Sequence, residues 1–436
     1  MTAPTARLLL AVAAAVAVSV AASAAAEYAE VTSTQLGPRP FYLLDRMEEG
    51  PLKRELAACA ADRSRYEPSD FSIGHRGAPL QFPEHTKESY LAAARMGAGI
   101  LECDVTFTRD RELVCRHAQC DLHRTTNILA TPLASKCSRP FTPAEFDPET
   151  GERVAAATAR CCTSDITAAE FGTLSGKMDA VDPDALTFQE YLGGTADFRT
   201  DLYATGGTLL THAESIALFR SLGRQFAPEL KAPAVTMPFE GEFSREDYAR
   251  KLVDEYRQAG IDPARVRLQS FSADDVRFWV DHAPEFGRQA ILLEGRDAEE
   301  LAAGPPSIAE FRALKRRGIN FLAPPMQVLV TAGGNGMVPS GYARRARAAG
   351  LELFSWTTER SGRVVEDIVA AGGAFYYDST AHLLRSDGDI LETIHVLARE
   401  VGIVGLFSDW PATTTFYANC MEVRRPPAAD GPERDR

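Results

Sequence analysis

The sequence predicts an α/β protein built as a (β/α)8, or TIM, barrel, with a cysteine-containing insertion over the C-terminal face of the barrel. Short apolar runs that suit strands buried on both faces recur along the chain, and segments with helical periodicity separate them. Polar side chains stand at the end of most of these runs, where a barrel carries its active site. A doubly wound open sheet is the alternative, but no Gly-rich dinucleotide or Walker loop follows any expected strand.

The expected elements alternate in the order that a barrel requires. We expect barrel strands at 71–74, 99–105, 226–230, 266–270, 290–293, 319–322, 352–356 and 374–377. A short strand at 113–116 is expected to form a hairpin with 106–108. Helices are expected at 88–95, 244–258, 276–282 and 342–349, from their apolar spacing and their Ser, Asp and Gly boundary residues.

The chain divides into five parts. Residues 1–26 read as a signal peptide, because Arg7 precedes the apolar run 8–20, and small residues follow at the expected cleavage site. A membrane anchor is the alternative for this segment, and the shortness of the run argues against it. The other parts are an N-terminal extension (27–69), the barrel (70–117 and 209–400), the insertion (118–208, with a helix at 168–174), and a C-terminal segment (401–436) whose charged, Pro-rich tail we expect to be disordered.

Composition limits the classes of partner. The 436-residue chain carries a formal net charge of -13, which argues against nucleic-acid binding through a general basic surface. The signal peptide expected at 1–26 predicts an exported, periplasmic or extracellular protein. No apolar run outside the first 26 residues reaches membrane-spanning length, so we expect no stable membrane anchor. The sequence gives no indication of an oligomeric state.

Eight cysteines in an exported chain suggest disulfides. A bridge between Cys59 and Cys420 would join the two ends of the mature chain, and the loop-rich stretch with Cys137, Cys161 and Cys162 would gain from cross-linking. Burial in an apolar strand would by itself account for Cys103. Zinc is the competing interpretation for one cluster, whose ligand types and spacing are suitable: Cys115, His117, Cys120 and His123.

The chemistry-bearing residues gather at the expected strand ends. His75 and Arg76 follow the first strand, Glu102 and Asp104 lie two residues apart on the second, and His117 follows the hairpin. Glu229 and Lys231 end the third strand. Three crowded carboxylates repel one another unless a cation joins them, and hard oxygen ligands favour Ca²⁺ or Mg²⁺. With two histidines and two cations nearby, this set suits the cleavage of a phosphodiester.

These residues stand in motifs that resemble the glycerophosphodiester phosphodiesterase family. The matching stretches are His75-Arg76-Gly77, Pro83-Glu84-His85-Thr86, Glu102-x-Asp104, Leu113-Val114-x-x-His117, Glu229-x-Lys231, Gln269-Ser270-Phe271 and Trp356-Thr357. The resemblance implies a TIM barrel, one divalent cation, and hydrolysis of a small glycerophosphodiester to sn-glycerol 3-phosphate and an alcohol. It further implies an acid–base pair, His75 and His117; metal ligands, Glu102, Asp104 and Glu229; phosphate-binding residues, Arg76 and Lys231; and residues lining the glycerol side, Trp356 and Phe271.

Two positions depart from the family pattern. His85 stands where the family usually has Asn, so it is a structural substitute or a third proton carrier. Ala118 stands where the family has Asp, so another group must orient His117. Two other functions remain open at this point. One is a lysophospholipase D-like or sphingomyelinase D-like activity on lipids, and the other is a non-catalytic module that binds phosphodiesters.

Overall fold

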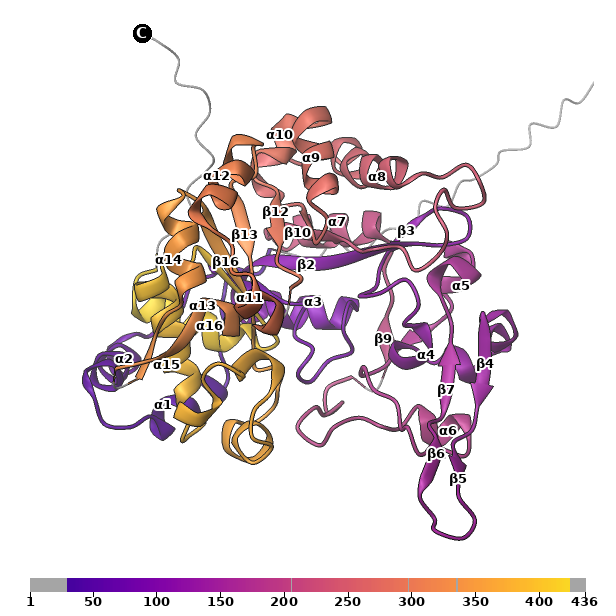
Figure 1. Ribbon diagram of the computed structural model, residues 1–436, viewed down its shortest axis with the longest axis horizontal. Coiled ribbons are helices and arrows are strands. Elements are labelled where there is room, and N and C mark those ends of the chain that lie inside the picture. Colours follow the sequence, from indigo (N-terminus) through magenta and orange to yellow (C-terminus); the bar gives the residue numbers. More distant parts are fainter. Residues whose placement is uncertain (1–29, 205, 297, 335, 424–436) are drawn as a thin grey trace, which may run out of the picture.

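The computed structural model describes residues 30–204, 206–296, 298–334 and 336–423, and within them eight parallel strands close into a barrel (Figure 1). The first strand pairs with both the second and the last, which closes the sheet, and β3 (Leu113–Cys115) pairs antiparallel with β2 at its side. The barrel strands are β1 (Ser69–Gly74), β2 (Ala98–Phe107), β10 (Gln225–Leu230), β11 (Gln269–Ser270), β12 (Ile291–Leu293), β13 (Phe321–Ala323), β16 (Glu352–Thr358) and β17 (Gly405–Ser408). The expected TIM barrel is thus confirmed.

Helices connect the strands and cover the outside of the barrel (Figure 1). They are α3 (Lys87–Arg95), α7 (His212–Ser221), α8 (Arg245–Gln258), α9 (Ala273–His282), α10 (Pro284–Gly287), α11 (Ala298–Ala303), α12 (Ile308–Arg316), α13 (Met326–Leu329), α14 (Gly341–Ala348), α15 (Asp389–His395) and α16 (Pro411–Cys420), with a β14 (Val330–Gly333) and β15 (Gly336–Pro339) hairpin after α13. Side-chain caps fix where several helices begin: Ser244 caps α8 together with Asp247, and Ser272 caps α9.

The position of the eighth strand was predicted wrongly. Residues 374–377 do not form a strand; Phe375–Tyr377 is a single 3-10 turn. The strand that closes the barrel is β17, beyond position 400, where the barrel was expected to end. Both segments are four-residue apolar runs, so local pattern does not separate them, and only pairing with β1 and β16 selects Gly405–Ser408.

Two hydrophobic layers hold the barrel. The side chains inside it form a compact plug: Ile73, Ile100, Ala227, Ile291, Leu293, Phe321, Ala323, Phe354 and Phe407. A larger layer lies between the strands and the surrounding helices, and it includes the buried Trp279, Tyr248 and Tyr417. The N-terminal helices α1 (Arg39–Arg46) and α2 (Pro51–Asp62) pack against α16. The plug leaves the C-terminal ends of the strands as the rigid rim for a site.

The insertion has its own small core and extends as a lobe beside the barrel (Figure 1). Its elements are α4 (Leu122–Thr125), η1 (Ile128–Ala130), η2 (Pro132–Lys136), β4 (Arg139–Thr142), β5 (Glu145–Phe146), β6 (Arg153–Ala155), β7 (Thr158–Arg160), η3 (Thr163–Asp165), α5 (Ala168–Phe171), β8 (Ser175–Gly176), α6 (Phe188–Tyr191) and β9 (Gly207–Thr208). The lobe reaches the loops after the barrel strands, as when Arg160 donates to the carbonyl of Ala234 over 2.8 Å.

All eight cysteines of the described chain are paired in disulfides. The expected bridge Cys59–Cys420 forms and joins α2 to α16. Cys120–Cys162 and Cys137–Cys161 cross-link the insertion. The fourth bridge, Cys103–Cys115, joins β2 to β3, so burial alone does not account for Cys103. Because Cys115 and Cys120 are both oxidised, neither offers the thiolate that the zinc interpretation required.

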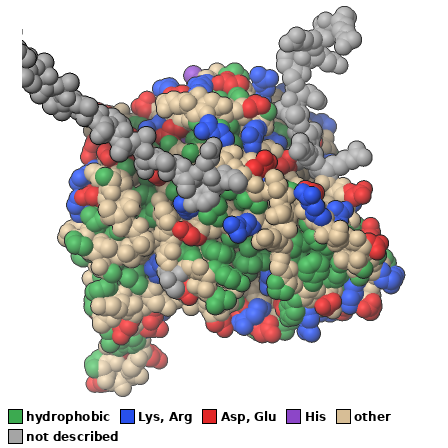
Figure 2. Space-filling view, turned by 180° about the vertical axis from the view of Figure 1, so that it is seen from behind, with side chains coloured by type: hydrophobic (Ala, Val, Ile, Leu, Met, Phe, Trp, Pro, Cys, Tyr) green, Lys and Arg blue, Asp and Glu red, His purple; other side chains and the backbone are tan. Residues whose placement is uncertain are grey.

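Acidic and basic side chains are interspersed over the face turned away from the view of Figure 1 (Figure 2). Within the described residues, the helices are too short or too polar to cross a bilayer. The signal peptide expected at 1–26 and the tail expected after Arg424 lie outside the described residues.

Candidate active site

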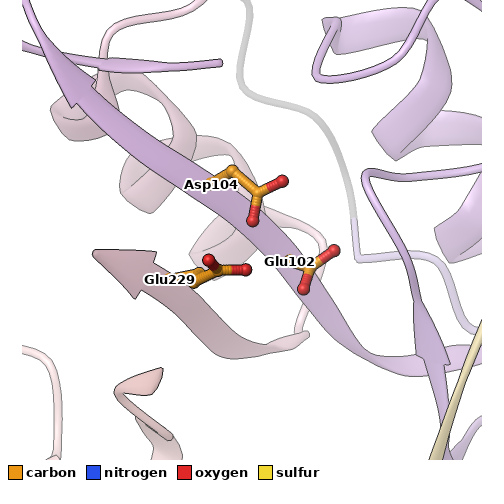
Figure 3. A group of neighbouring side chains, drawn as sticks. All are labelled: Glu102, Asp104 and Glu229. Carbon is orange, nitrogen blue, oxygen red and sulfur yellow. The ribbon is translucent and has the colours of Figure 1, made fainter. Parts of the chain in front are cut away.

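Three carboxylates from two neighbouring strands point into one space at the barrel mouth (Figure 3). Glu102 and Asp104 alternate with Cys103 on β2 and share a face of the strand. Glu229 on β10 is the register partner of Asp104. One oxygen from each of the three carboxylates lies within 4.8 Å of the others, and all three side chains are buried.

The electrostatics of this cluster fit a hard cation. Burial raises the pKa of Glu102 well above its usual range, and Asp104 and Glu229 raise it further. Burial also raises the pKa of Glu229, to about 7, although Lys231 opposes the shift. Among the described residues, no donor reaches Oδ1 of Asp104, a buried oxygen. A divalent cation would remove the repulsion and supply the missing partner, and the all-oxygen donor set suits Ca²⁺ or Mg²⁺.

His75 is held by a carboxylate from the last strand. Its Nδ1 lies 2.5 Å from Oδ1 of Asp409, the residue directly after β17. Oδ2 of Asp409 accepts from Arg199 of the insertion and from Arg360 after β16, each over 3.0 Å. With Nδ1 donating to Asp409, Nε2 carries the lone pair and is left for the pocket. Burial lowers the pKa of His75 to about 4, and Asp409 opposes that shift, so the ring is neutral at pH 7.

The loop after β1 is shaped by a network around Arg76. Arg76 adopts a left-handed backbone conformation (φ 56°), its amide donates to Oε2 of Glu102 over 2.9 Å, and its guanidinium pairs with Glu84 over 3.0 Å. His85, also left-handed (φ 55°), lies with Nε2 2.9 Å from Oδ2 of Asp104 and Nδ1 2.9 Å from the hydroxyl of Tyr90. Both ring nitrogens of His85 therefore have hydrogen-bonding partners, and the ring links Asp104 to Tyr90.

His117 reaches the site from the end of the β2–β3 hairpin. Burial lowers the pKa of this ring well below its usual range, and the positive charges of Arg76 and Lys231 lower it further. No hydrogen bond to the His117 ring occurs in the part of the chain that the structure describes. We expected another group to orient His117, because Ala118 stands where the family has a carboxylate, but no described residue does so. The nearby Asp121 carboxylate accepts from the Ala118 amide over 3.0 Å.

Lys231 and a set of aromatic rings complete the walls. Nζ of Lys231 lies 2.6 Å from Oε1 of Glu229 and 5.7 Å from the ring centre of Phe271. The Phe271 ring meets the Trp356 ring edge to face, with 6.0 Å between their centres, and the Tyr376 ring centre lies 5.7 Å from that of Trp356. The site therefore has a charged floor and an aromatic side.

All nine residues predicted for the site line one cavity of about 40 Å³. They are His75, Arg76, Glu102, Asp104, His117, Glu229, Lys231, Phe271 and Trp356, and the structure adds Gln269, Leu293, Tyr376 and Phe407. Asp409, Arg360 and Arg199 were missed. The sequence does carry a signal for Asp409, which is a short apolar run followed by Asp and a nearby Pro. Because the last strand was misplaced, Asp378 was assigned to the end of the eighth strand instead. Asp378 lies exposed on the surface.

The sequence of the chain matches a known protein family. The sequence model described as the "Glycerophosphoryl diester phosphodiesterase family" matches residues 75–413, which confirms the resemblance read from the motifs. An "Extracellular protein" of Arthroderma benhamiae is 49% identical over 249 residues, which is 56% of this chain and 100% of that protein. A "Probable glycerophosphodiester phosphodiesterase 1" of Mycobacterium tuberculosis is 51% identical over 47 residues, 11% of this chain and 17% of that protein.

Solved structures of low identity have also been matched. A putative glycerophosphoryl diester phosphodiesterase from Silicibacter pomeroyi aligns with a TM-score of 0.49 at 18% identity, covering 80% of this chain and 95% of that one. A phosphodiesterase of Oleispira antarctica, solved with the product sn-glycerol-3-phosphate, aligns with a TM-score of 0.45 at 17% identity, covering 79% and 95%.

Proposed function

This chain belongs to the glycerophosphoryl diester phosphodiesterase family, and we propose that it hydrolyses glycerophosphodiesters to sn-glycerol 3-phosphate and an alcohol. The observation that carries the proposal is the meeting of His75, His117 and three carboxylates around a single cavity. A module that only binds phosphodiesters would have no need of two neutral imidazoles beside a cation site.

The two histidines supply the proton transfers. One accepts the proton of the attacking hydroxyl, from water or from the glycerol 2-hydroxyl, while the new P–O bond forms. The other donates a proton to the alcohol oxygen as the old P–O bond breaks. A cyclic phosphate formed by the 2-hydroxyl would then be opened by water. Both rings are neutral at pH 7, since burial lowers both pKa values, so one begins as a base and the other must gain its proton in the complex.

The charged groups neutralise the phosphoryl oxygens. Arg76 and Lys231 line the cavity and carry the positive charge that an anionic diester requires. Glu102, Asp104 and Glu229 would hold one divalent cation, Ca²⁺ or Mg²⁺. A cation bound there stabilises negative charge on the phosphoryl group. Phe271 and Trp356 would pack against the glycerol carbons.

We also propose that the protein works outside the cytoplasm. The four disulfides suit an oxidising compartment. The name of the Arthroderma benhamiae relative, "Extracellular protein", and the signal-like first 26 residues agree with export.

The test is release of glycerol 3-phosphate from glycerophosphocholine, with and without a chelator. We expect activity that a chelator abolishes and that added Ca²⁺ or Mg²⁺ restores. His75→Ala and His117→Ala should each lower kcat by roughly two to four orders of magnitude, the usual contribution of a general acid or base. His282→Ala is the matched control, because this histidine lies exposed on α9. Near wild-type turnover in either site variant would refute the assignment of that histidine.

A further inference from the structure

A second, larger cavity opens beside the catalytic one. It has a volume of about 630 Å³, and we call it the basic chamber. Arg76 and His117 line both cavities, so the two spaces meet at these side chains. A diester bound against His117 therefore has room for its second substituent in the basic chamber.

The insertion builds most of the chamber wall. Arg124, Arg139, Arg160 and Asp179 come from the insertion, and Arg360 comes from the loop after β16. Two disulfides hold the wall in place, since Cys137 and Cys161 flank Arg139 and Arg160 in sequence and Cys120 itself lines the chamber. The chamber is thus a rigid feature that the barrel alone would lack.

Arg139 and Arg160 carry uncompensated positive charge. They are direct register partners on β4 and β7, which lie side by side in the insertion (Figure 1). Like charges placed opposite one another on paired strands destabilise a sheet. Arg160 bonds to Ser138 Oγ and to the Ala234 carbonyl, and among the described residues no carboxylate forms an ion pair with Arg139 or Arg160.

Two other arginines of the chamber wall, Arg124 and Arg360, already have carboxylate partners. Arg124 pairs with Asp179 over 2.6 Å, and Arg360 pairs with Asp409 over 3.0 Å. The surplus charge therefore sits at the Arg139–Arg160 pair, although the whole chain carries a formal net charge of -13. An anion between these two guanidiniums would turn a repulsive pair into two charge-assisted contacts.

We infer that the basic chamber is the leaving-group subsite and that it selects an alcohol bearing a second phosphate. This inference rests on the proposed phosphodiesterase function. The aromatic wall of Phe271 and Trp356 takes the glycerol carbons of the product side, so the ester oxygen of the departing alcohol faces His117 and the chamber. A wall of arginines and carboxylates does not suit an acyl chain, which disfavours lysophospholipids as substrates.

The test compares two substrates that differ by one phosphate: glycerophosphoglycerol and its terminal monophosphate. We expect the wild type to cleave both and to show a kcat/KM at least roughly tenfold higher for the phosphorylated substrate, as expected for charge-assisted contacts. In Arg139→Gln/Arg160→Gln the ratio of the two kcat/KM values should fall to near one. Arg153→Gln, in the same lobe but paired with Asp184 and away from the chamber, should keep the wild-type ratio.

The outcomes separate the two proposals. If the metal-loaded wild type cleaves neither substrate, the proposed function fails. If it cleaves both with a ratio near one, or if the double variant keeps the wild-type ratio, the inference about the chamber fails and the function stands. If the double variant does not fold, the ratio of the two kcat/KM values is measured for the wild type at increasing salt concentration. Salt screens charges, so a preference that depends on charge must decrease. A ratio that salt leaves unchanged would overturn the inference.

Discussion

Replacing Asp409 by Asn tests the link between the last strand and His75. Asp409 is fully buried, and its carboxylate lies 2.5 Å from His75 Nδ1 while it also accepts from Arg199 and Arg360. The amide of Asn can donate to Nδ1, which would move the ring proton to Nε2 and remove the lone pair that faces the pocket. We therefore expect kcat to fall by roughly 10²- to 10⁴-fold, the range for losing a general acid or base.

The same change removes the negative charge between the buried Arg199 and the partly buried Arg360. Breaking a buried ion pair by removing one partner costs about 3 to 5 kcal/mol, so the unfolding free energy in urea should fall by up to that amount. Asp409 also raises the pKa of His75 against the effect of burial, so its loss moves the acid limb of the pH–rate profile to lower pH. This shift separates a positioning role from simple loss of stability.

The assay is kcat on glycerophosphocholine from pH 9 down to well below the His75 pKa of about 4, together with urea unfolding of each protein. Asp378→Asn is the control, because Asp378 is the exposed carboxylate that the sequence placed at this strand exit. The control should match wild type in rate and stability. A folded Asp409→Asn protein with kcat within about threefold of wild type and an unmoved acid limb would refute the reasoning.

Three further predictions follow from the structure. Glu102→Gln should raise the Ca²⁺ or Mg²⁺ concentration needed for half-maximal activity at least roughly tenfold, and full activity in a chelator would contradict the cation site. Cys59→Ser/Cys420→Ser should lower the unfolding free energy by about 2 to 4 kcal/mol, because this bridge closes a separation of 361 residues; an unchanged urea midpoint would argue against it. Burial lowers the pKa of His123 to about 4, below the ordinary value of 6.5. The unfolded chain therefore binds more protons at this site as pH falls from about 6.5 to about 4, and stability declines over that window. His123→Gln should therefore lose less unfolding free energy between pH 7 and pH 4.5 than the wild type, as measured by urea unfolding. An equal loss in the variant and the wild type would contradict this prediction.

Much of the site was readable from local pattern. The two-residue spacing of Glu102 and Asp104 fixes a shared strand face whatever the rest of the fold does. The positions of His75, Arg76 and Glu229 at the ends of apolar runs place them at one rim once a barrel is assumed. The motif order then identified the family, because its residue types are set by the chemistry of the reaction.

Only the tertiary structure decided the features that depend on distant pairing. His75 and Asp409 stand 334 positions apart, and the four-residue strand before Asp409 looks no different in sequence from the turn at Phe375–Tyr377. The pairing of Cys137 with Cys161 and the facing of Arg139 with Arg160 likewise follow from strand register in the insertion. The chemistry of each side chain follows from its residue type alone. Strand register and long-range pairing, in contrast, depend on the free energy of the whole packed chain.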